Sequence, residues 1–307
     1  MVTKDRSRRT ARHSYDRSMT YDLIIGDYAY SSWSLRGWLL FDRFGIPVRT
    51  RLIDFDAGDV ATQMSDYAPA RTVPTLLTPE GVAVSDSLAI AEELASRHPE
   101  AGHWPSDAAA RATARTLAAE MHAGFSALRQ ACPMNLRLAY AEVPVSDAVQ
   151  GDLTRIEAIW SHALDRFGGP WLCGAYSAAD AYFAPVAARI AGYGLTVGPL
   201  AAGYVAAHLA DPSFRRWRAL GMVTGAALAK YAKDYRQVAW PGPAVLAARS
   251  IESGNPENDA CLYSGKPITH FLEAEGRIFG FCNSYCRDKT VADPLAWDAF
   301  VTAYAAS

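Results

Sequence analysis

The sequence lacks long hydrophobic runs and a clear excess of charge of either sign. No window approaches the roughly 18 uninterrupted apolar residues of a transmembrane helix, so we expect no membrane association. Its 30 basic and 32 acidic residues give a formal net charge of −2, which argues against the basic surface of a dedicated nucleic-acid binder. Hydrophobic residues nevertheless make up 50% of the chain, enough for a buried core, and this excludes wholesale disorder.

Cysteine is also scarce. The 307 residues include five cysteines, an odd number in a chain too long to be a small disulfide-stapled domain. We therefore expect a reducing compartment, the cytoplasm.

The first residues form a basic tail. Residues 1–18 contain six basic and two acidic side chains and no apolar stretch of the kind found in a secretory signal. A strand pattern begins directly after Met19, which makes Met19 an alternative start of the chain. We expect residues 1–19 to be a disordered tail; a transit-like peptide and a nucleic-acid-binding arm are the alternatives.

Residues 20–100 alternate between strand and helix patterns. The run 21–26 is apolar and ends in glycine, serine caps open a helix that stops before Gly45, and 48–52 alternates with period two. A hairpin over 73–84 and an amphipathic helix over 86–97 follow. This order predicts a βαβ unit followed by ββα, a small mixed α/β sheet with helices on its faces.

The rest of the chain divides into three segments. Residues 106–235 are alanine-rich with helical periodicity and show no convincing strand, so we expect an all-helical domain. Residues 236–258 are rich in Pro, Gly, Ser and Asn, as a linker would be. Residues 259–307 form a small module that carries three of the cysteines.

Three motifs in this arrangement carry a family resemblance. SSWSLRGWLL follows the first strand, ARTVPTLL contains the middle strand, and SDSLAIAEEL opens the third helix; SAAD (177–180) adds a helix-capping motif in the second domain. Over about residues 21–235 the chain resembles the glutathione S-transferase family, and within it a serine-type, zeta-like bacterial group. The resemblance implies a thioredoxin-like domain followed by an all-α domain, a homodimer, and glutathione and a small hydrophobic electrophile as substrates.

Serines at the start of the first helix are the candidate catalytic groups. The exposed N–H groups and the dipole at a helix N-terminus favour a thiolate, and a hydroxyl there can donate a hydrogen bond to its sulfur. The resemblance assigns this role to Ser31, with Ser32 supporting or replacing it. The alternative is that both serines are only helix caps. Trp33 stands where zeta-like relatives have cysteine, which disfavours cysteine-dependent chemistry and weakens an isomerase assignment.

The resemblance also supplies a set of glutathione-binding residues. A cis-proline at Pro74 would let the backbone of Val73 pair with the cysteinyl backbone of glutathione. Asp86 and Ser87 would receive the ammonium and carboxylate of the γ-glutamyl end, and Arg71 the glycyl carboxylate. The complete predicted set is Trp33, Arg71, Thr72, Val73, Pro74, Asp86 and Ser87.

The second substrate is expected between the two domains. Candidate residues come from the first loop and from the first helix of the helical domain: Tyr28, Tyr30, Trp33, Met121, His122, Phe125 and Arg129. Met121 and Phe125 are spaced i, i+4, so an equally good interpretation places both in the helical core.

The C-terminal cysteines have the spacing of metal ligands. Cys261, Cys282 and Cys286 form C-x20-C-x3-C, and three thiolates can make up most of a tetrahedral zinc or soft-metal site. Their surroundings resemble TRASH/YHS treble-clef-like modules. The fourth ligand is open between Asp259, His270 and water, and the alternative is that the cysteines are simply buried. Cys132 and Cys173 lie in helical context and are expected to be structural.

Three functional hypotheses follow from the sequence. The first is a glutathione transferase that conjugates or isomerises a small electrophile. The second is a transferase-like scaffold without turnover, with a metal-sensing C-terminal module. The third is that the C-terminal unit only stabilises or dimerises the fold.

Overall fold

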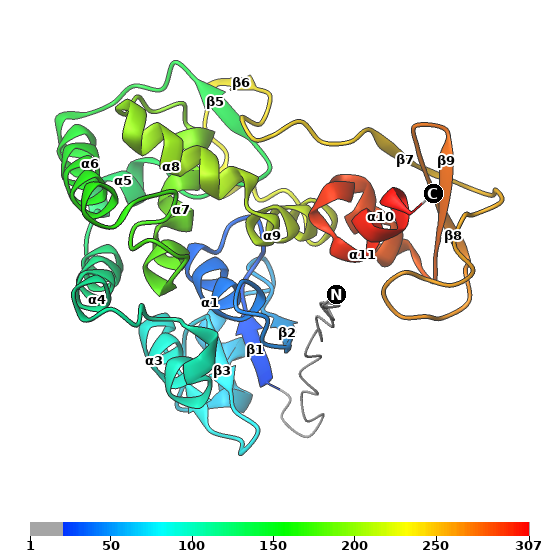
Figure 1. The fold of residues 1–307 in the computed structure, drawn as a ribbon, viewed down its shortest axis with the longest axis horizontal. Coiled ribbons are helices and arrows are strands. Elements are labelled where there is room, and N and C mark those ends of the chain that lie inside the picture. Colours follow the sequence, from blue (N-terminus) through cyan, green and yellow to red (C-terminus); the bar gives the residue numbers. More distant parts are fainter. Residues whose placement is uncertain (1–20, 307) are drawn as a thin grey trace, which may run out of the picture.

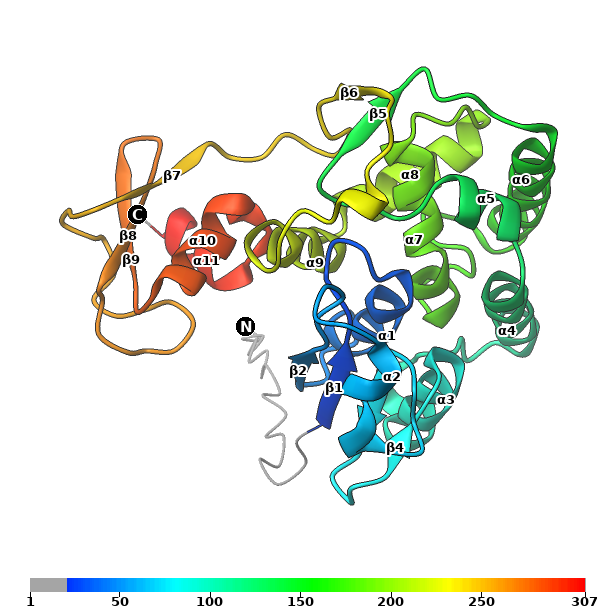
Figure 2. The same ribbon diagram turned by 180° about the vertical axis from the view of Figure 1, so that it is seen from behind.

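The computed structural model describes residues 21–306, arranged as three parts (Figures 1 and 2). A small α/β domain lies against a helical domain, and a C-terminal appendage lies beyond helix α9. The predicted basic tail, residues 1–19, falls outside the described residues.

The N-terminal domain is built on a four-stranded sheet of order β2-β1-β3-β4. Strand β1 runs parallel to β2 and antiparallel to β3, with Leu23 opposite both Thr50 and Leu76. This is the predicted βαβ-ββα order and a thioredoxin-like domain. Its elements are β1 (Tyr21–Ile25), α1 (Ser32–Asp42), β2 (Val48–Leu52), α2 (Val60–Gln63), β3 (Thr75–Leu77), β4 (Ala83–Val84) and α3 (Ser87–Arg97).

The helical domain is organised around α7, which is buried along almost its whole length and packs against α1, α4 and α8. Among the described residues, no helix is both long and apolar enough to cross a membrane. The helices are α4 (Ala108–Ala123), α5 (Ser126–Ala131), α6 (Asp147–Phe167), α7 (Ala178–Gly192), α8 (Pro199–Ala210) and α9 (Pro212–Val223).

The start of α7 is fixed by a capping box. The Asp180 carboxylate accepts hydrogen bonds from the Ser177 N–H (2.8 Å), the Leu172 N–H (3.0 Å) and the Tyr204 hydroxyl (2.9 Å). Because Asp180 is fully buried, these donors replace the water that the carboxylate loses. The SAAD motif thus orients α7, the helix that supplies Arg189 to the cavity described below.

One strand interrupts the predicted all-helical segment. Strand β5 (Ala139–Ala141) pairs antiparallel with β6 (Arg236–Val238), with Tyr140 opposite Gln237. The expectation of no strand in 106–235 is wrong at this point. The pairing covers three residues on each side and joins segments far apart in the chain, so no local periodicity indicates it.

The appendage contains a three-stranded antiparallel sheet of order β7-β8-β9 followed by two short helices. Its elements are β7 (Ala248–Ile251), β8 (His270–Ala274), β9 (Arg277–Phe281), α10 (Ser284–Ala292) and α11 (Asp298–Ala305). Strand β7 lies inside the segment 236–258 that was expected to be a linker. Its pairing with β8 makes 248–251 part of the appendage, although its composition is that of a loop.

Ion pairs on α9 dock the appendage. Arg215 donates two hydrogen bonds to the Asp293 carboxylate, at 2.8 and 2.5 Å, and both side chains are largely buried. Arg216 donates to the Ala296 carbonyl (2.9 Å) and to the Asp42 carboxylate at the end of α1 (2.7 Å). Arg216 therefore ties α9 to both the appendage and the N-terminal domain.

Candidate functional site

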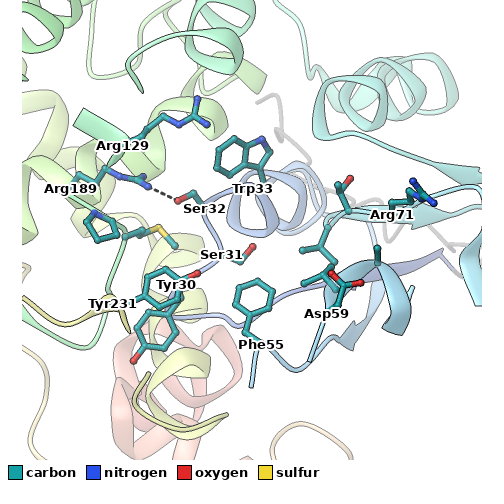
Figure 3. A pocket seen from close by; sticks show the side chains of 16 residues that line it. Tyr30, Ser31, Ser32, Trp33, Phe55, Asp59, Arg71, Arg129, Arg189 and Tyr231 are labelled. Carbon is teal, nitrogen blue, oxygen red and sulfur yellow. Dashed lines mark hydrogen bonds between the residues drawn. The ribbon is translucent and has the colours of Figure 1, made fainter. Parts of the chain in front are cut away.

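A cavity of about 480 Å³ lies beside the N-terminus of α1, between the N-terminal and helical domains (Figure 3). The N-terminal domain contributes one wall, and the helical domain with the segment 224–235 contributes the other. The lining residues are Tyr30, Ser31, Ser32, Trp33, Phe55, Asp59, Val60, Ala61, Arg71, Thr72, Val73, Arg129, Pro133, Met134, Arg189 and Tyr231.

The cavity gathers most of the residues singled out in the sequence. The two serines and four of the predicted glutathione-binding residues line it: Ser31, Ser32, Trp33, Arg71, Thr72 and Val73. Pro74 is buried behind the lining, and its peptide bond with Val73 is cis, as expected.

Asp86 and Ser87 lie at the N-terminus of α3 and do not line the cavity. Asp86 caps α3 through the Leu88 N–H (2.9 Å) and lies 3.1 Å from His122 Nε2. The Ser87 side chain is completely buried, and its hydroxyl has no hydrogen-bond partner in the described structure.

Ser31 is the N-cap of α1. Its Oγ accepts a hydrogen bond from the Ser34 N–H (3.3 Å) and donates one to Ser34 Oγ (2.8 Å), and Ser34 Oγ in turn accepts from the Gly26 N–H (2.9 Å). The Ser31 hydroxyl proton is thus used within the helix cap.

Ser32 is bonded differently. Its Oγ accepts a hydrogen bond from Arg189 Nη2 at 2.9 Å, the bond drawn in Figure 3. An oxygen that accepts from a cation keeps its own proton to donate. Of the two serines, Ser32 is the one whose O–H is not used by a protein acceptor in the described structure.

Arg189 is rigidly held. Its Nε donates to the Cys132 carbonyl (2.8 Å) and its Nη1 to the Pro185 carbonyl (3.1 Å), so the third bond, to Ser32, has little freedom. The side chain is buried, and burial lowers its pKa to about 10, which leaves it charged at neutral pH.

Two further arginines flank Trp33. The guanidinium carbons of Arg129 and Arg36 lie 4.3 and 4.9 Å from the centre of the Trp33 ring. Arg36 is fully buried, none of its three nitrogens has a hydrogen-bond partner among the described residues, and burial lowers its pKa to about 9. None of the three arginines forms an ion pair with a carboxylate within residues 21–306.

Aromatic rings form the opposite side of the cavity. Tyr30 and Tyr231 are stacked with ring centres 4.7 Å apart, and Phe55 lies next to them (Figure 3). The Leu228 N–H donates to the Tyr30 hydroxyl at 3.0 Å. This bond fixes the segment 224–235 as a wall of the cavity.

The predicted second-substrate residues divide between cavity and core. Tyr30, Trp33 and Arg129 line the cavity, whereas Tyr28, Met121 and Phe125 are buried in the core and His122 faces Asp86. For Met121 and Phe125 the core interpretation is therefore correct. The cavity residues that the sequence analysis missed lie in loops, on α2 or in the middle of α7: Phe55, Asp59, Val60, Ala61, Pro133, Met134, Arg189 and Tyr231.

The three C-terminal cysteines converge in the appendage. The sulfur atoms of Cys261, Cys282 and Cys286 all lie within 4.8 Å of one another, and those of Cys282 and Cys286 are 4.0 Å apart. In a tetrahedral zinc site with Zn–S bonds of about 2.3 Å, the sulfur atoms are about 3.8 Å apart, so the cluster fits such an ion. Neither Asp259 nor His270 belongs to this group among the described residues.

The electrostatics at Cys261 also suit a metal ligand. Burial would raise the pKa of its thiol, but hydrogen bonds from the Ser264 side chain and from neighbouring backbone N–H groups outweigh it and lower the pKa to about 6. Burial and the neighbouring Cys261 raise the pKa of the Cys286 thiol to about 11. Cys132 and Cys173 are buried free thiols outside this cluster, and burial raises their pKa values to about 11 and 12. This agrees with the structural role expected for those two.

Comparison with known proteins identifies the fold. Residues 30–97 match the family model described as glutathione S-transferase, N-terminal domain. No curated protein matches the chain. Among solved structures, a glutathione transferase homolog from Burkholderia gl BGR1 with bound glutathione is 23% identical with a TM-score of 0.51, over 67% of this chain and 99% of that one.

Two other structures give the same picture. Glutathione transferase Omega 2S from Trametes versicolor, in complex with 2,4-dihydroxybenzophenone, is 21% identical (TM-score 0.51, 65% of this chain and 93% of that one). Ure2p in complex with S-hexylglutathione is 18% identical (TM-score 0.51, 64% and 97%). The thioredoxin-like domain and the helical domain of this chain together have the architecture of glutathione transferases.

Proposed function

We propose that the chain is a glutathione transferase that uses a serine hydroxyl to stabilise the glutathione thiolate for attack on, or reversible addition to, a small electrophile. The observation that carries the proposal is the bond from Arg189 to Ser32 in a cavity at the N-terminus of α1, within a glutathione transferase fold.

Ser32 is the proposed thiolate donor. Its O–H donates a hydrogen bond to the glutathione sulfur. Arg189 donates a hydrogen bond to the Ser32 oxygen and brings a positive charge close to the site. Arg189 acts as a positioning residue, because each of its three nitrogens already donates a hydrogen bond to the protein and its side chain is buried. The N-terminus of α1 contributes in the same direction.

Ser31 is proposed to act mainly as the helix cap and as a second donor to the sulfur. Its side chain lines the cavity, but its proton is shared with Ser34. This reverses the order of importance that the family resemblance gives the two serines.

The rest of glutathione is proposed to extend along the N-terminal domain. Arg71 and Thr72 are exposed at the cavity wall and suit the glycyl end, and the backbone at Val73 before the cis-proline suits the cysteinyl unit. Asp86, half-exposed at the start of α3, is proposed for the γ-glutamyl ammonium. The Ser87 hydroxyl is completely buried, so a contact with the γ-glutamyl carboxylate requires the start of α3 to open on binding. Trp33 would pack against the bound tripeptide.

A thiolate titration tests the serine assignment. With wild-type protein, the ultraviolet absorbance of bound glutathione should titrate about one to two pKa units below the free thiol, the range expected for a charge-assisted hydrogen bond. Ser32→Ala should remove most of that shift, and Ser31→Ala should mainly lower stability. Equal titration curves for wild type and Ser32→Ala would refute the role of Ser32.

An activity assay distinguishes the proposed enzyme from the alternative, a glutathione-binding scaffold without turnover. Conjugation of glutathione to 1-chloro-2,4-dinitrobenzene, followed by absorbance, should exceed the uncatalysed rate and fall about tenfold or more in Ser32→Ala. Glutathione binding by calorimetry without any turnover for this or other acceptors would favour a binding scaffold.

The resemblance further supports a homodimer in the cytoplasm. Light scattering of the purified chain would give its oligomeric state, and a monomer at micromolar concentration would contradict that expectation.

A second proposed property is metal binding by the appendage. The convergence of Cys261, Cys282 and Cys286 supports a three-thiolate site for zinc or another soft metal, with water or an exogenous group as the fourth ligand. Such an ion would stabilise the fold of the appendage.

Metal analysis under reducing conditions tests the site. We expect close to one ion per chain in the wild type and loss of the ion in Cys286→Ser, with Cys132→Ser as the matched control. Less than about half an ion per chain in the wild type would count against a structural metal.

A further inference from the structure

Charge is unevenly distributed around the cavity. Arg36 and Arg129 lie over the Trp33 ring, with guanidinium carbons 4.9 and 4.3 Å from its centre, and Arg189 donates a hydrogen bond to the neighbouring Ser32. Asp59, the acidic residue among the lining side chains, belongs to the opposite end, where it caps α2 next to Arg71 (Figure 3). The wall formed by α1 and the helical domain is therefore strongly positive.

Within the described residues, Asp86 acts on Arg36 from a distance, but no acidic side chain is paired directly with the cluster. No carboxylate forms an ion pair with any of the three arginines in the part of the chain that the structure describes. Burying three cationic side chains close together costs free energy of folding unless an anion binds near them. A glutathione thiolate at Ser32 supplies one negative charge and leaves the wall with an excess of positive charge.

Arg129 is the member of the cluster best placed to contact a ligand. Arg36 is fully buried, and Arg189 is 4% exposed and already donates one N–H from each of its nitrogens, to Cys132, Pro185 and Ser32. Arg129 is half-buried, lines the cavity and donates one hydrogen bond, from Nη1 to the Gly124 carbonyl (3.2 Å). Within the described residues its other N–H groups remain available for the two parallel bonds that suit a carboxylate.

The shape and polarity of the other wall suit a flat molecule. Tyr30, Tyr231 and Phe55 present aromatic surface opposite the serines, and Met134 adds an adaptable apolar contact. An occupant that uses both walls is acidic at one end and unsaturated or aromatic at the other.

We propose that the second substrate is a small anionic electrophile, with a carboxylate bound by Arg129 and a planar body against Tyr30, Phe55 and Tyr231. This rests on the proposed transferase function and replaces the expectation of a purely hydrophobic electrophile. In a substitution of this class, the glutathione sulfur forms a bond to the electrophilic carbon, and the leaving group, for example chloride, departs with its electron pair.

Matched acceptors test the proposal by turnover. The full chain is assayed with glutathione and either 4-chloro-3,5-dinitrobenzoate or 1-chloro-2,4-dinitrobenzene, and each kcat/KM is divided by the uncatalysed rate constant. We expect the wild type to favour the carboxylate by about tenfold or more, as loss of a charge-assisted hydrogen bond would cost. Arg129→Met should remove this preference mainly through KM, Arg129→Lys should retain part of it, and the exposed Arg166→Met should leave it unchanged.

A binding experiment keeps the proposal separate from the transferase function. Calorimetry measures the unreactive pair 3,5-dinitrobenzoate and 1,3-dinitrobenzene against wild type and the two Arg129 variants, with melting temperatures confirming that each variant is folded. Tighter binding of the benzoate than of dinitrobenzene to wild type, lost in Arg129→Met, supports the anionic site. If that result comes without turnover of any acceptor, the proposed transferase function is refuted but the anionic site is not. Equal affinity for both compounds, or an undiminished preference in folded Arg129→Met, overturns the proposal even if glutathione is conjugated.

Discussion

Arg189 is proposed to affect the glutathione thiolate through its hydrogen bond to Ser32. It is held by the Cys132 and Pro185 carbonyls and delivers one N–H to Ser32. If the charge acts through that hydroxyl, removing Arg189 matters only while Ser32 is present. A pair of residues that act as one unit shows such non-additivity in a double-mutant cycle.

We therefore predict the outcome of the cycle between Ser32→Ala and Arg189→Gln. Each single change should raise the pKa of bound glutathione by about one unit, and the double variant should resemble Ser32→Ala alone. Thiolate absorbance measured against pH checks this. Additive shifts would mean that Arg189 stabilises the sulfur directly, without Ser32.

His208 makes the free energy of unfolding of the helical domain depend on pH. It is buried among Trp171, Tyr176 and Tyr204, its Nε2 has no partner within the described residues, and burial lowers its pKa to about 3. The ordinary histidine pKa is 6.5, so below that pH the unfolded chain takes up a proton that the folded chain does not. Stability is lost as the pH falls from 6.5 towards 3.

The prediction for His208 follows from this difference. Between pH 7 and pH 5 its contribution to the free energy of unfolding should fall by about 2 kcal/mol. Chemical denaturation of wild type and His208→Leu at the two pH values checks it, because the gap between them should move by that amount in favour of the variant. Asp180, whose pKa burial raises to about 6, changes in the opposite sense but is common to both proteins. A constant gap would contradict the prediction.

At the scale of elements, helix α1 packs closely against Pro74, which lies next to the proposed glutathione site. A Cβ added at Gly37 would lie 2.9 Å from the Cβ and Cγ atoms of Pro74, closer than a normal contact. Glycine in a helix costs up to about 1 kcal/mol relative to alanine, so its presence here is explained by the close approach.

Gly37→Ala should therefore displace the strand that begins after Pro74. We expect lower stability and glutathione affinity reduced about tenfold, because the backbone at Val73 would move. The matched control is Gly203→Ala on the exposed face of α8, where nothing lies within 4 Å and alanine should stabilise by up to about 1 kcal/mol. Calorimetry and thermal unfolding measure both; tighter or unchanged glutathione binding in Gly37→Ala would be the contrary result.

Elements with strong local signals were predictable from the sequence. The largely apolar run of β1, which contains one charged residue (Asp22), the serines before α1 and the turn residues Pro79–Gly81 predicted the order of the N-terminal strands and most of their bounds. Strands β6 and β7 escaped prediction because they are three or four residues long, largely polar, and defined by partners distant in the chain.

The candidate site was predictable on one wall only. Ser31, Ser32, Trp33 and Arg71–Val73 cluster in motifs of the N-terminal domain, so their proximity follows from the fold. Arg189 reaches Ser32 across 157 positions from a helix whose sequence shows no sign of facing a cavity. Tyr231 ends a single 3-10 turn (Ala229–Tyr231) within an otherwise irregular segment, whose path depends on tertiary contacts.

At the scale of the whole molecule, a largely buried ion pair fastens the appendage to the body where α10 packs against α9. Arg215 and Asp293 pair in a largely buried position, and Arg216 bridges Asp42 and the Ala296 carbonyl. Removing one partner of a buried ion pair typically costs about 3–5 kcal/mol, because the other charge is left without compensation.

Asp293→Ala should therefore loosen the appendage without disturbing the cavity. We expect faster cleavage by a nonspecific protease in the segment 239–247 and release of a C-terminal fragment, with glutathione affinity within about twofold of wild type. Mass spectrometry of the digest identifies the cut, and Asp298→Ala, an exposed position 3.7 Å from Arg216, serves as the control. A digestion rate equal to that of wild type would contradict the prediction.

Substitutions in the segment 224–235 can change one wall of the cavity. It closes one side of the cavity yet has little regular structure, and it is fastened by the Tyr30 hydroxyl at Leu228, the Tyr140 hydroxyl at Lys233 and the Lys230 contact with the Phe55 carbonyl. Loops accept substitution and length change far more readily than the helices beside them. Substitutions in this segment can thus change the aromatic wall at Tyr231, by nature or by a protein engineer, while Ser32 on α1, Arg189 on α7 and Arg129 keep their places.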